Sequence, residues 1–368
     1  MNKVAVVGYG NTKFSNEDKP IESLLVSATK SLFDQTKNID KNDIDAVLVS
    51  TNDNAKYLSA ILSELTGISP KISHTVENLC SSGTNSIVSA YSYLVAGLAD
   101  IALVVGADRY DCHGQILEWD SARGEFKHPI FWASMFTKAH KREFGTTEED
   151  LAVVSAKNHT NAKLNPHAYS DKTYSIDDVL QSKFVTDDLH LLDCSRPCSG
   201  ASSVLLASEN VAKKFEQPVW IKGIGQKTTS ASLTKNESLT TMTSTKIAAR
   251  QAFDMAKIQV NDVDVAELHD AFTICEIMAL EDLGFAKKGE GVSYVRELYG
   301  TQDKKINPRG GLIGAGHPLG ATGVAQVAEI TQQLQNKAEK RQVKNVNVGL
   351  VHNMSAAATS SNVLLFQS

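Results

Sequence analysis

The sequence lacks the features of a disulfide-rich protein, of a nucleic-acid-binding protein and of a membrane-spanning or secreted protein. Its 368 residues include five cysteines, an odd and scattered number, which excludes a disulfide framework and favours reduced thiols. Lysine and arginine number 37 against 42 acidic residues, which gives a formal charge of -5. The overall charge therefore does not favour binding to nucleic acid or to an anionic membrane. No run of about 20 apolar residues occurs, and MNKVAVVGYG lacks the apolar stretch of a signal peptide. We therefore expect a cytoplasmic protein that binds neither nucleic acid nor membrane.

The order of predicted elements repeats along the chain. Residues 3–10 predict a buried strand, 21–36 an amphipathic helix and 44–50 a second strand. The same order returns at 245–272, where AFDMAKIQVNDVDVAELHD answers LFDQTKNIDKNDIDAVLVS. Each copy continues into a glycine-containing turn, a small-residue helix and another apolar strand. This pattern predicts an α/β fold of two similar halves, with mostly parallel sheets covered by helices on both sides.

The segment between the halves differs from both in composition. Residues 111–192 are rich in histidine, tryptophan and charge, and we expect them to form an insertion that folds over one face. Residues 226–244 are rich in serine and threonine without apolar periodicity, which indicates a loop. The predicted organisation is an N-terminal half of residues 1–110 plus about 193–225, an inserted loop domain of residues 111–192, and a C-terminal half of residues 226–368.

Cys80 stands in the stretch ENLCSSGTN, just before a predicted helix with one apolar face. Free amide groups and the positive end of the dipole at a helix N-terminus favour the thiolate, the nucleophilic form of cysteine. A cysteine packed as a small hydrophobic residue at a strand end is the alternative interpretation. Cys80 is therefore a candidate nucleophile on this stretch alone.

Two histidines occupy comparable turns. His317 lies in GGLIGAGHPLGATG, whose glycines let the backbone approach a ligand, and it could accept a proton from a thiol or stabilise an oxyanion. A phosphate loop is the alternative, although the stretch spells neither a Walker loop nor GxGxxG. His269 precedes the predicted helix AFTICEIMALEDLGF at a strand-to-helix corner, where α/β sheets place ligands. A lone histidine at such a corner is more often a structural residue than a catalyst. With the turn VHNMSAAATSS (351–361), these segments predict one composite site containing a nucleophile and a base.

The ordered motifs ENLCSSGTNSIVSAYSYLVAGLADIALVVGAD, HDAF and GHPLGATG resemble those of the thiolase superfamily over essentially the whole chain, most closely archaeal and sterol-carrier-protein-type thiolases. The resemblance implies a homodimer or homotetramer of αβαβα layered subunits that act on acyl-CoA. It implies that the substrate acylates Cys80, that His317 is the activating base, and that His269 donates to the thioester oxygen of the second substrate. Backbone N–H groups of Cys80 and Ser355 would form an oxyanion hole.

The chain departs from the thiolase pattern at the second cysteine, which deprotonates the incoming acetyl group. Most thiolases carry it in a C-terminal Cys-x-Gly turn, where this chain has His352 or Asn353, and sterol-carrier-protein-type enzymes carry it in His-Asp-Cys-Phe, where this chain has Ala271. Cys275, one helical turn further on, is a candidate substitute, although a core thiol is an ordinary fate for it. Cys194 and Cys198 are interpreted as structural residues.

The resulting hypothesis is an acetyl-CoA C-acetyltransferase that uses coenzyme A thioesters and no cofactor or metal. The resemblance also implies a possible complex with 3-hydroxy-3-methylglutaryl-CoA (HMG-CoA) synthase and a zinc-binding OB-fold protein. The insertion contains a cluster of basic residues: Arg123, Lys127, Lys138, Lys141 and Arg142. These side chains could bind the phosphates of coenzyme A or could simply face water.

Four alternatives compete with this hypothesis. They are a non-catalytic or partner-dependent acyl-CoA-binding subunit, a 3-ketoacyl-CoA thiolase for longer chains, a decarboxylating ketoacyl synthase, and a nicotinamide oxidoreductase. GHPLGATG favours a thiolase over a ketoacyl synthase. Lys13 stands where a dinucleotide-binding loop needs its third glycine, which excludes the oxidoreductase.

Overall fold

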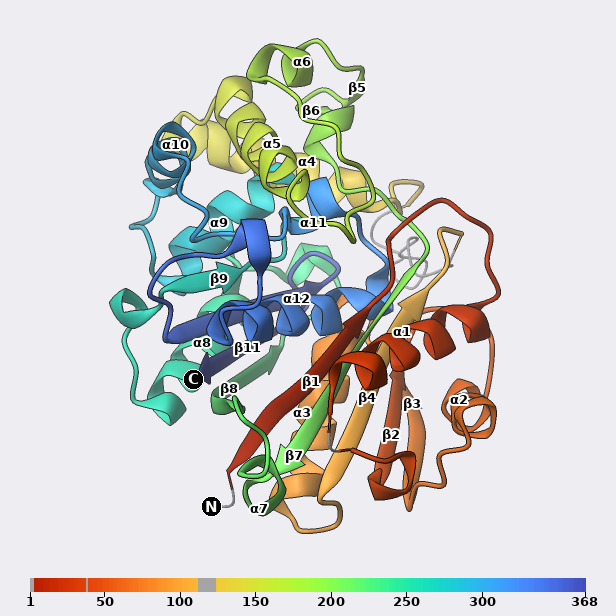
Figure 1. The fold of residues 1–368 in the computed structure, drawn as a ribbon. Helices are drawn as coiled ribbons and strands as arrows, with labels where there is room; N and C mark the ends of the chain where they lie inside the picture. The colour runs from red at the N-terminus through yellow and green to blue at the C-terminus, as the bar shows by residue number, and fades with distance from the viewer. Residues whose placement is uncertain (1–2, 38, 112–123) are drawn as a thin grey trace.

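The structure is a computed structural model and describes residues 3–37, 39–111 and 124–368. One sheet of nine strands runs through it in the order β3-β2-β4-β7-β1-β8-β11-β10-β9 (Figure 1). The first half supplies β1 (Val4–Asn11), β2 (Ala46–Ser50), β3 (Ile72–Val76), β4 (Ile101–Asp108) and β7 (Gly200–Ser208). The second half supplies β8 (Val219–Thr228), β9 (Val265–Glu267), β10 (Val348–Ser355) and β11 (Ser360–Gln367). The halves meet where β1 pairs with β8 at Ala5–Trp220 and Val6–Val219.

The two halves repeat one arrangement on either side of this junction. Outward from β1 the order is β7, β4, β2 and β3, and outward from β8 it is β11, β10 and β9, followed by a parallel bridge from Ala266 to Ile306 in the place of β3. The predicted α/β fold of two similar halves is therefore confirmed.

The expectation of mostly parallel sheets is wrong. Among the described strands of the large sheet, β2–β3, β2–β4 and β9–β10 pair in parallel, and the other five pairings are antiparallel. The reason is the connections: β10 returns directly into β11 through a tight hairpin, and β7 runs back beside β4 after the insertion. His352 and Asn353, placed in a turn from the sequence, lie within β10.

Helices cover both faces and also fill the space between the halves. The outer face of the first half carries α1 (Ile21–Gln35) and α2 (Leu58–Thr66), and that of the second half carries α8 (Thr243–Ala256). Between them lie α3 (Ser82–Val95) and α12 (Leu319–Leu334). Helix α12 is buried along its whole length because it packs on β4 and β7 of one half and on β9 and β10 of the other (Figure 1). The layers therefore follow the αβαβα order.

The described part of the inserted segment lies above the second half (Figure 1). It contains α4 (Pro129–Phe144), α5 (Glu148–Ala162), α6 (Ile176–Leu180) and the hairpin of β5 (Phe184–Thr186) and β6 (Leu189–His190). It packs on helices of the second half, among them α9 (Thr273–Leu283), which contacts α4, and α11 (Gly311–Ala315), which contacts α5. The remaining helices are α7 (Glu209–Ala212) and α10 (Gly291–Thr301). No described helix combines the length and the apolar character needed to cross a membrane.

Candidate active site

Cys80 lies in a short 3₁₀ turn, Leu79–Ser81, that leads directly into α3. The predicted position at a helix N-terminus is therefore confirmed. Leu79 has φ 48°, a left-handed conformation that is rare for a residue with a bulky side chain. The Ser82 hydroxyl donates to the Leu79 carbonyl at 2.6 Å and accepts from Asn78 N–H at 2.7 Å, which holds the turn in this shape.

Asp108, at the end of β4, connects the Cys80 turn with the loop that carries His317. Its carboxylate accepts from Gly320 N–H at 2.5 Å, at the start of α12, and from the Thr51 hydroxyl at 2.7 Å. Asn52 donates through its backbone N–H to the same carboxylate at 2.8 Å and through its side chain to the Leu79 carbonyl at 3.0 Å. The spacing between the cysteine turn and the histidine loop is thus set through one buried carboxylate.

His317 presents an unpartnered ring nitrogen to the site. Its Nδ1 lies 2.7 Å from the Thr322 hydroxyl, and that hydroxyl donates its single proton to the Pro318 carbonyl at 2.9 Å. Nδ1 must therefore carry the proton and donate to Thr322. His317 Nε2 is buried and has no partner among the described residues, so it is left as a free acceptor. This tautomer is the one that a general base requires.

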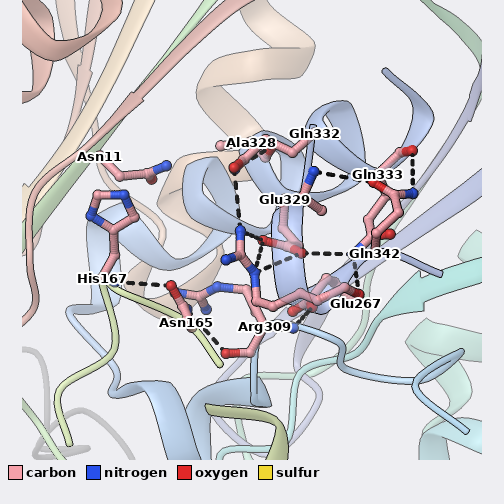
Figure 2. Close-up of polar contacts among 12 residues, drawn as sticks. Asn11, Asn165, His167, Glu267, Arg309, Ala328, Glu329, Gln332, Gln333 and Gln342 are labelled. Atoms are coloured by element: carbon pink, nitrogen blue, oxygen red, sulfur yellow. Dashed lines mark hydrogen bonds and ion pairs between the residues drawn. The ribbon is translucent and has the colours of Figure 1, made fainter. Parts of the chain in front are cut away.

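A buried polar network includes Glu267, Arg309 and Glu329 (Figure 2). Arg341 and Glu329 form an ion pair with two N–O distances of 3.1 Å and one of 3.0 Å. Glu267 accepts from Arg309 N–H at 3.0 Å, and Asn165 donates to the Arg309 carbonyl at 3.0 Å. Because Arg309 directly precedes Gly310 and Gly311, these contacts fix the start of the glycine-rich segment.

His269 has the opposite tautomer from His317. The Asn353 side-chain amide donates to His269 Nδ1 at 2.9 Å, and its carbonyl oxygen accepts from the Thr84 hydroxyl at 2.9 Å. That hydroxyl accepts in turn from the Asn362 amide at 2.7 Å. Since Nδ1 is an acceptor, the proton of the neutral ring is on Nε2, where it is a hydrogen-bond donor.

The neighbouring Asp270 does not face the site. Its carboxylate accepts from Leu312 N–H at 2.6 Å and Ile313 N–H at 3.3 Å, in the first turn of α11. The Asn158 side chain donates to it at 2.7 Å. Asp270 therefore joins the His269 segment to the glycine-rich segment and the insertion, and it positions the two histidines rather than reacting.

These residues meet at one cavity of about 160 Å³. Cys80 Sγ and one ring nitrogen from each of His269 and His317 all lie within 4.8 Å of one another. The histidine rings are nearly perpendicular, with centroids 5.2 Å apart. Cysteine and two histidines are also a donor set that zinc accepts. Much of the remaining lining is apolar, and it comes from segments far apart in the sequence: Leu79, Pro129, Ile130, Trp132, Pro197, Ala271, Phe272, Leu319 and Ala356.

Burial dominates the electrostatics of the three reactive groups. It raises the pKa of Cys80 to about 12, although the Ala356 backbone N–H at the sulfur acts in the other direction. Burial and the nearby Arg309 charge lower the pKa of His317 to about 3, and burial together with His317 and His352 lowers that of His269 well below its usual range. The expectation that the helix N-terminus favours a resting thiolate is therefore wrong, because desolvation outweighs the helix dipole. The cavity holds a neutral thiol beside neutral imidazoles.

The backbone amide that faces Cys80 lies one residue beyond Ser355, the residue that the resemblance implied for an oxyanion hole. Ala356, not Ser355, lines the cavity and directs its backbone N–H at Cys80. Ala356 has φ 48°, which turns this amide out of the β10–β11 hairpin. The N–H of Cys80 itself lies at the same sulfur.

Of the predicted candidates for the second acid/base, His269 lines the cavity, whereas Cys275, His352 and Asn353 do not. Cys275 is fully buried in α9, where burial raises its pKa above the usual range. His352 is fully buried and contacts the Thr245 hydroxyl at 3.0 Å through Nε2. Asn353 acts through His269. A residue interpreted as structural, Cys194, does line the cavity. No local pattern marked it, since its position depends on the bridge that Cys194 forms with the distant Phe272.

The described basic residues of the insertion are also absent from the cavity lining. Arg123 is outside the described residues, as is Cys112. Lys138 pairs with Asp188 at 3.4 Å, and Lys141 pairs with Glu148 and Asp188 at 3.6 Å. Lys127 precedes the cavity-lining His128, and Arg142 is exposed near the end of α4. A contact with coenzyme A phosphates stays a prediction for these side chains.

Comparison with known proteins agrees with this geometry. Residues 4–210 match the thiolase N-terminal domain, and residues 225–368 match the thiolase C-terminal domain-like family. An acetyl-CoA acetyltransferase of Methanothermobacter thermautotrophicus is 34% identical over the full length of both chains. Sterol carrier protein 2 of Bos taurus is 33% identical over 96% of this chain and 70% of its own. The solved structure of an Ltp2-ChsH2(DUF35) aldolase superposes with a TM-score of 0.88 at 22% identity, covering 98% of this chain and 97% of that one. The chain therefore belongs to the thiolase family.

Proposed function

We propose that the protein is an acetyl-CoA C-acetyltransferase, which condenses two acetyl-CoA molecules to acetoacetyl-CoA and coenzyme A and also catalyses the reverse thiolysis. The observation that carries the proposal is the convergence of Cys80, His317 and His269 on one cavity. The names of archaeal relatives at 33% and 34% identity support the acetyl specificity. Coenzyme A thioesters are the substrates, and no further cofactor is needed.

The proposed first half-reaction begins with a proton transfer. Acyl-CoA enters the cavity, Cys80 gives its proton to the free Nε2 of His317, and the thiolate attacks the thioester carbonyl. The backbone N–H groups of Cys80 and Ala356 would stabilise the oxyanion. Because both partners are neutral at rest, the reactive pair forms only during this transfer.

His269 serves the second half-reaction. Its Nε2–H is proposed to donate to the thioester oxygen of the second acetyl-CoA and to stabilise the enolate formed when the α-proton leaves. The cavity volume of about 160 Å³ favours short acyl groups over long ones. A thiolase for longer 3-ketoacyl-CoA esters is the alternative within the same chemistry.

Cys80→Ser tests the proposal directly. A serine hydroxyl does not reach the anionic state that a thiol reaches by transfer to imidazole, so acetoacetyl-CoA thiolysis should fall by about 100-fold or more. Wild type should cleave acetoacetyl-CoA with a higher kcat/KM than longer 3-ketoacyl-CoA esters. A serine variant that keeps more than about a tenth of wild-type activity would remove Cys80 from the chemistry.

A partner-dependent activity is the second candidate. The superposed aldolase carries a ChsH2(DUF35) component in its name, which favours an interaction surface on this fold. Thiolysis by the purified chain alone, before any HMG-CoA synthase or OB-fold protein is added, separates the two candidates. Full activity of the isolated chain supports an independent enzyme, whereas activity that appears only with a partner supports the second.

A further inference from the structure

A second thiol faces the cavity from the segment that directly follows the insertion. Cys194 lines the same cavity as Cys80, His269 and His317, and its side chain is partly exposed there. The other two described thiols, Cys198 and Cys275, are fully buried and do not line it. The unpartnered Nε2 of His317 marks this cavity as a place where a ligand is bound.

The backbone places Cys194 beside the segment that follows His269. Cys194 forms an antiparallel bridge with Phe272, and Ser195 N–H donates to the Ala271 carbonyl at 2.9 Å. Paired residues of an antiparallel bridge direct their side chains to the same side, so the thiol lies on the cavity wall next to Phe272. Ala271 contributes only a methyl group to this wall.

The surroundings of Cys194 keep its proton in place at rest. Its Sγ lies 3.5 Å from the His190 carbonyl, which accepts a weak hydrogen bond from the thiol. Burial and the adjacent Asp193 charge raise the pKa of Cys194 to about 12. The resting group is therefore a protonated thiol, and it becomes a base only after a thiolate formed beside it takes its proton.

We propose that Cys194 is the second acid/base of the reaction, the group that moves the α-proton of the substrate. This role rests on the proposed function. During acylation of Cys80, the Cys80 proton passes to His317, the S–acyl bond to Cys80 forms, and the departing coenzyme A thiolate takes the proton of Cys194. The Cys194 thiolate then removes an α-proton from the methyl group of the second acetyl-CoA.

The remaining step restores the resting protonation state of Cys80, His317 and Cys194. The carbanion attacks the acetyl carbonyl on Cys80, the carbon–carbon bond forms, and the carbon–sulfur bond to Cys80 breaks. Cys80 takes its proton back from His317, and Cys194 keeps the α-proton as its own. Thiolysis follows the same steps in reverse, and neither direction needs an oxidant or reductant.

The test separates α-proton transfer from acylation. Wild type, Cys194→Ala, Cys194→Ser and the matched core-thiol control Cys275→Ala are incubated with acetyl-CoA in deuterated water. Mass spectrometry follows deuterium in the acetyl methyl group and acetylation of Cys80. Both Cys194 variants should lose at least about 100-fold in exchange rate while Cys80 is acetylated within about tenfold of the wild-type rate. Cys275→Ala should retain both reactions.

A relocated thiol provides the rescue. Because Ala271 lies on the same wall, Cys194→Ala combined with Ala271→Cys should regain exchange. Ala271→Cys alone should leave the exchange rate within about tenfold of wild type, because Cys194 already moves the α-proton, and a larger rise would show that the wild-type chain lacks a second acid/base. Exchange within about tenfold of wild type in Cys194→Ser, or equal losses of exchange and acetylation, would overturn the assignment. A wild-type chain that neither acetylates Cys80 nor cleaves acetoacetyl-CoA would instead overturn the proposed function, and this role with it.

Discussion

At the scale of single residues, the reactivity of Cys80 should depend steeply on pH. Alkylation by iodoacetamide requires the thiolate, and burial raises the pKa of Cys80 to about 12 in the free enzyme. The thiolate fraction therefore grows about tenfold per pH unit, and the alkylation rate should still be rising at about pH 9 to 10. Mass spectrometry of the Cys80 peptide measures it. A plateau at about pH 6 to 7 would show a resting thiolate–imidazolium pair instead.

His317→Ala should act on acylation rather than on this pH profile. The variant lacks the free Nε2 that takes the Cys80 proton, so acetylation of Cys80 by acetyl-CoA should slow by about 100-fold or more, within the usual range for a general base. The rise of alkylation toward high pH should persist, since the solvent replaces the base there. Wild-type acetylation rates in the variant would remove His317 from nucleophile activation.

His269→Ala should cost more in condensation than Cys275→Ala or His352→Ala. His269 lines the cavity with an Nε2–H donor, whereas neither of the other two side chains reaches it. We expect a difference of at least ~1.4 kcal/mol in activation free energy, a factor of ten in rate. Initial rates of acetyl-CoA condensation for the three variants decide the order, and an inactive Cys275 variant beside an active His269 variant would reverse it.

Asn353→Asp should convert His269 from a donor to an acceptor. A carboxylate cannot donate to Nδ1, so the ring would move its proton to Nδ1 and leave Nε2 bare, or gain a second proton. Condensation should fall by about tenfold or more while Cys80 acetylation persists. Nitrogen-15 NMR of labelled histidine reports the tautomer directly. An unchanged tautomer would show that Asn353 accepts from His269 in the wild type.

At the scale of elements, Asp108 connects the Cys80 turn with the loop that carries His317. Its removal leaves Gly320 N–H, Thr51 and Asn52 without their buried acceptor. Asp108→Ala should lower the free energy of unfolding by about 1–3 kcal/mol and should reduce kcat more than it raises KM. Thermal unfolding and acetoacetyl-CoA kinetics measure the two effects. A loss of stability without a loss of kcat would confine Asp108 to the scaffold.

The elements also show what the sequence could and could not predict. The apolar face of residues 87–98 placed the start of α3 beside Cys80, and glycine density marked the His317 loop, because both signals are local. The burial that keeps Cys80 protonated and the bridge that brings Cys194 to Phe272 depend on segments far apart in the sequence, which no local pattern encodes. The same limit produced the wrong parallel-sheet expectation, since strand direction followed from the connections.

At the scale of the whole molecule, the sheet ends in an edge strand that suits pairing with a second copy. Strand β3 is the outermost strand of the first half, and Ser73 and Thr75 on it are exposed in the single chain. An open edge of this kind presents unpaired backbone groups, and native proteins commonly block or cover it. In the homodimer that the resemblance implies, a second copy of the chain would cover this edge.

Thr75→Lys tests this arrangement. A lysine on an edge strand opposes strand-to-strand pairing because its charge would be brought against the same charge of the partner copy across a two-fold axis. Light scattering of wild type should give at least twice the chain mass of 39.8 kDa, and the variant should shift toward that mass at equal concentration. Ser92→Lys, a change at an exposed position of α3, is the control and should leave the mass unchanged. A variant as large as wild type would place the contact between copies elsewhere on the molecule.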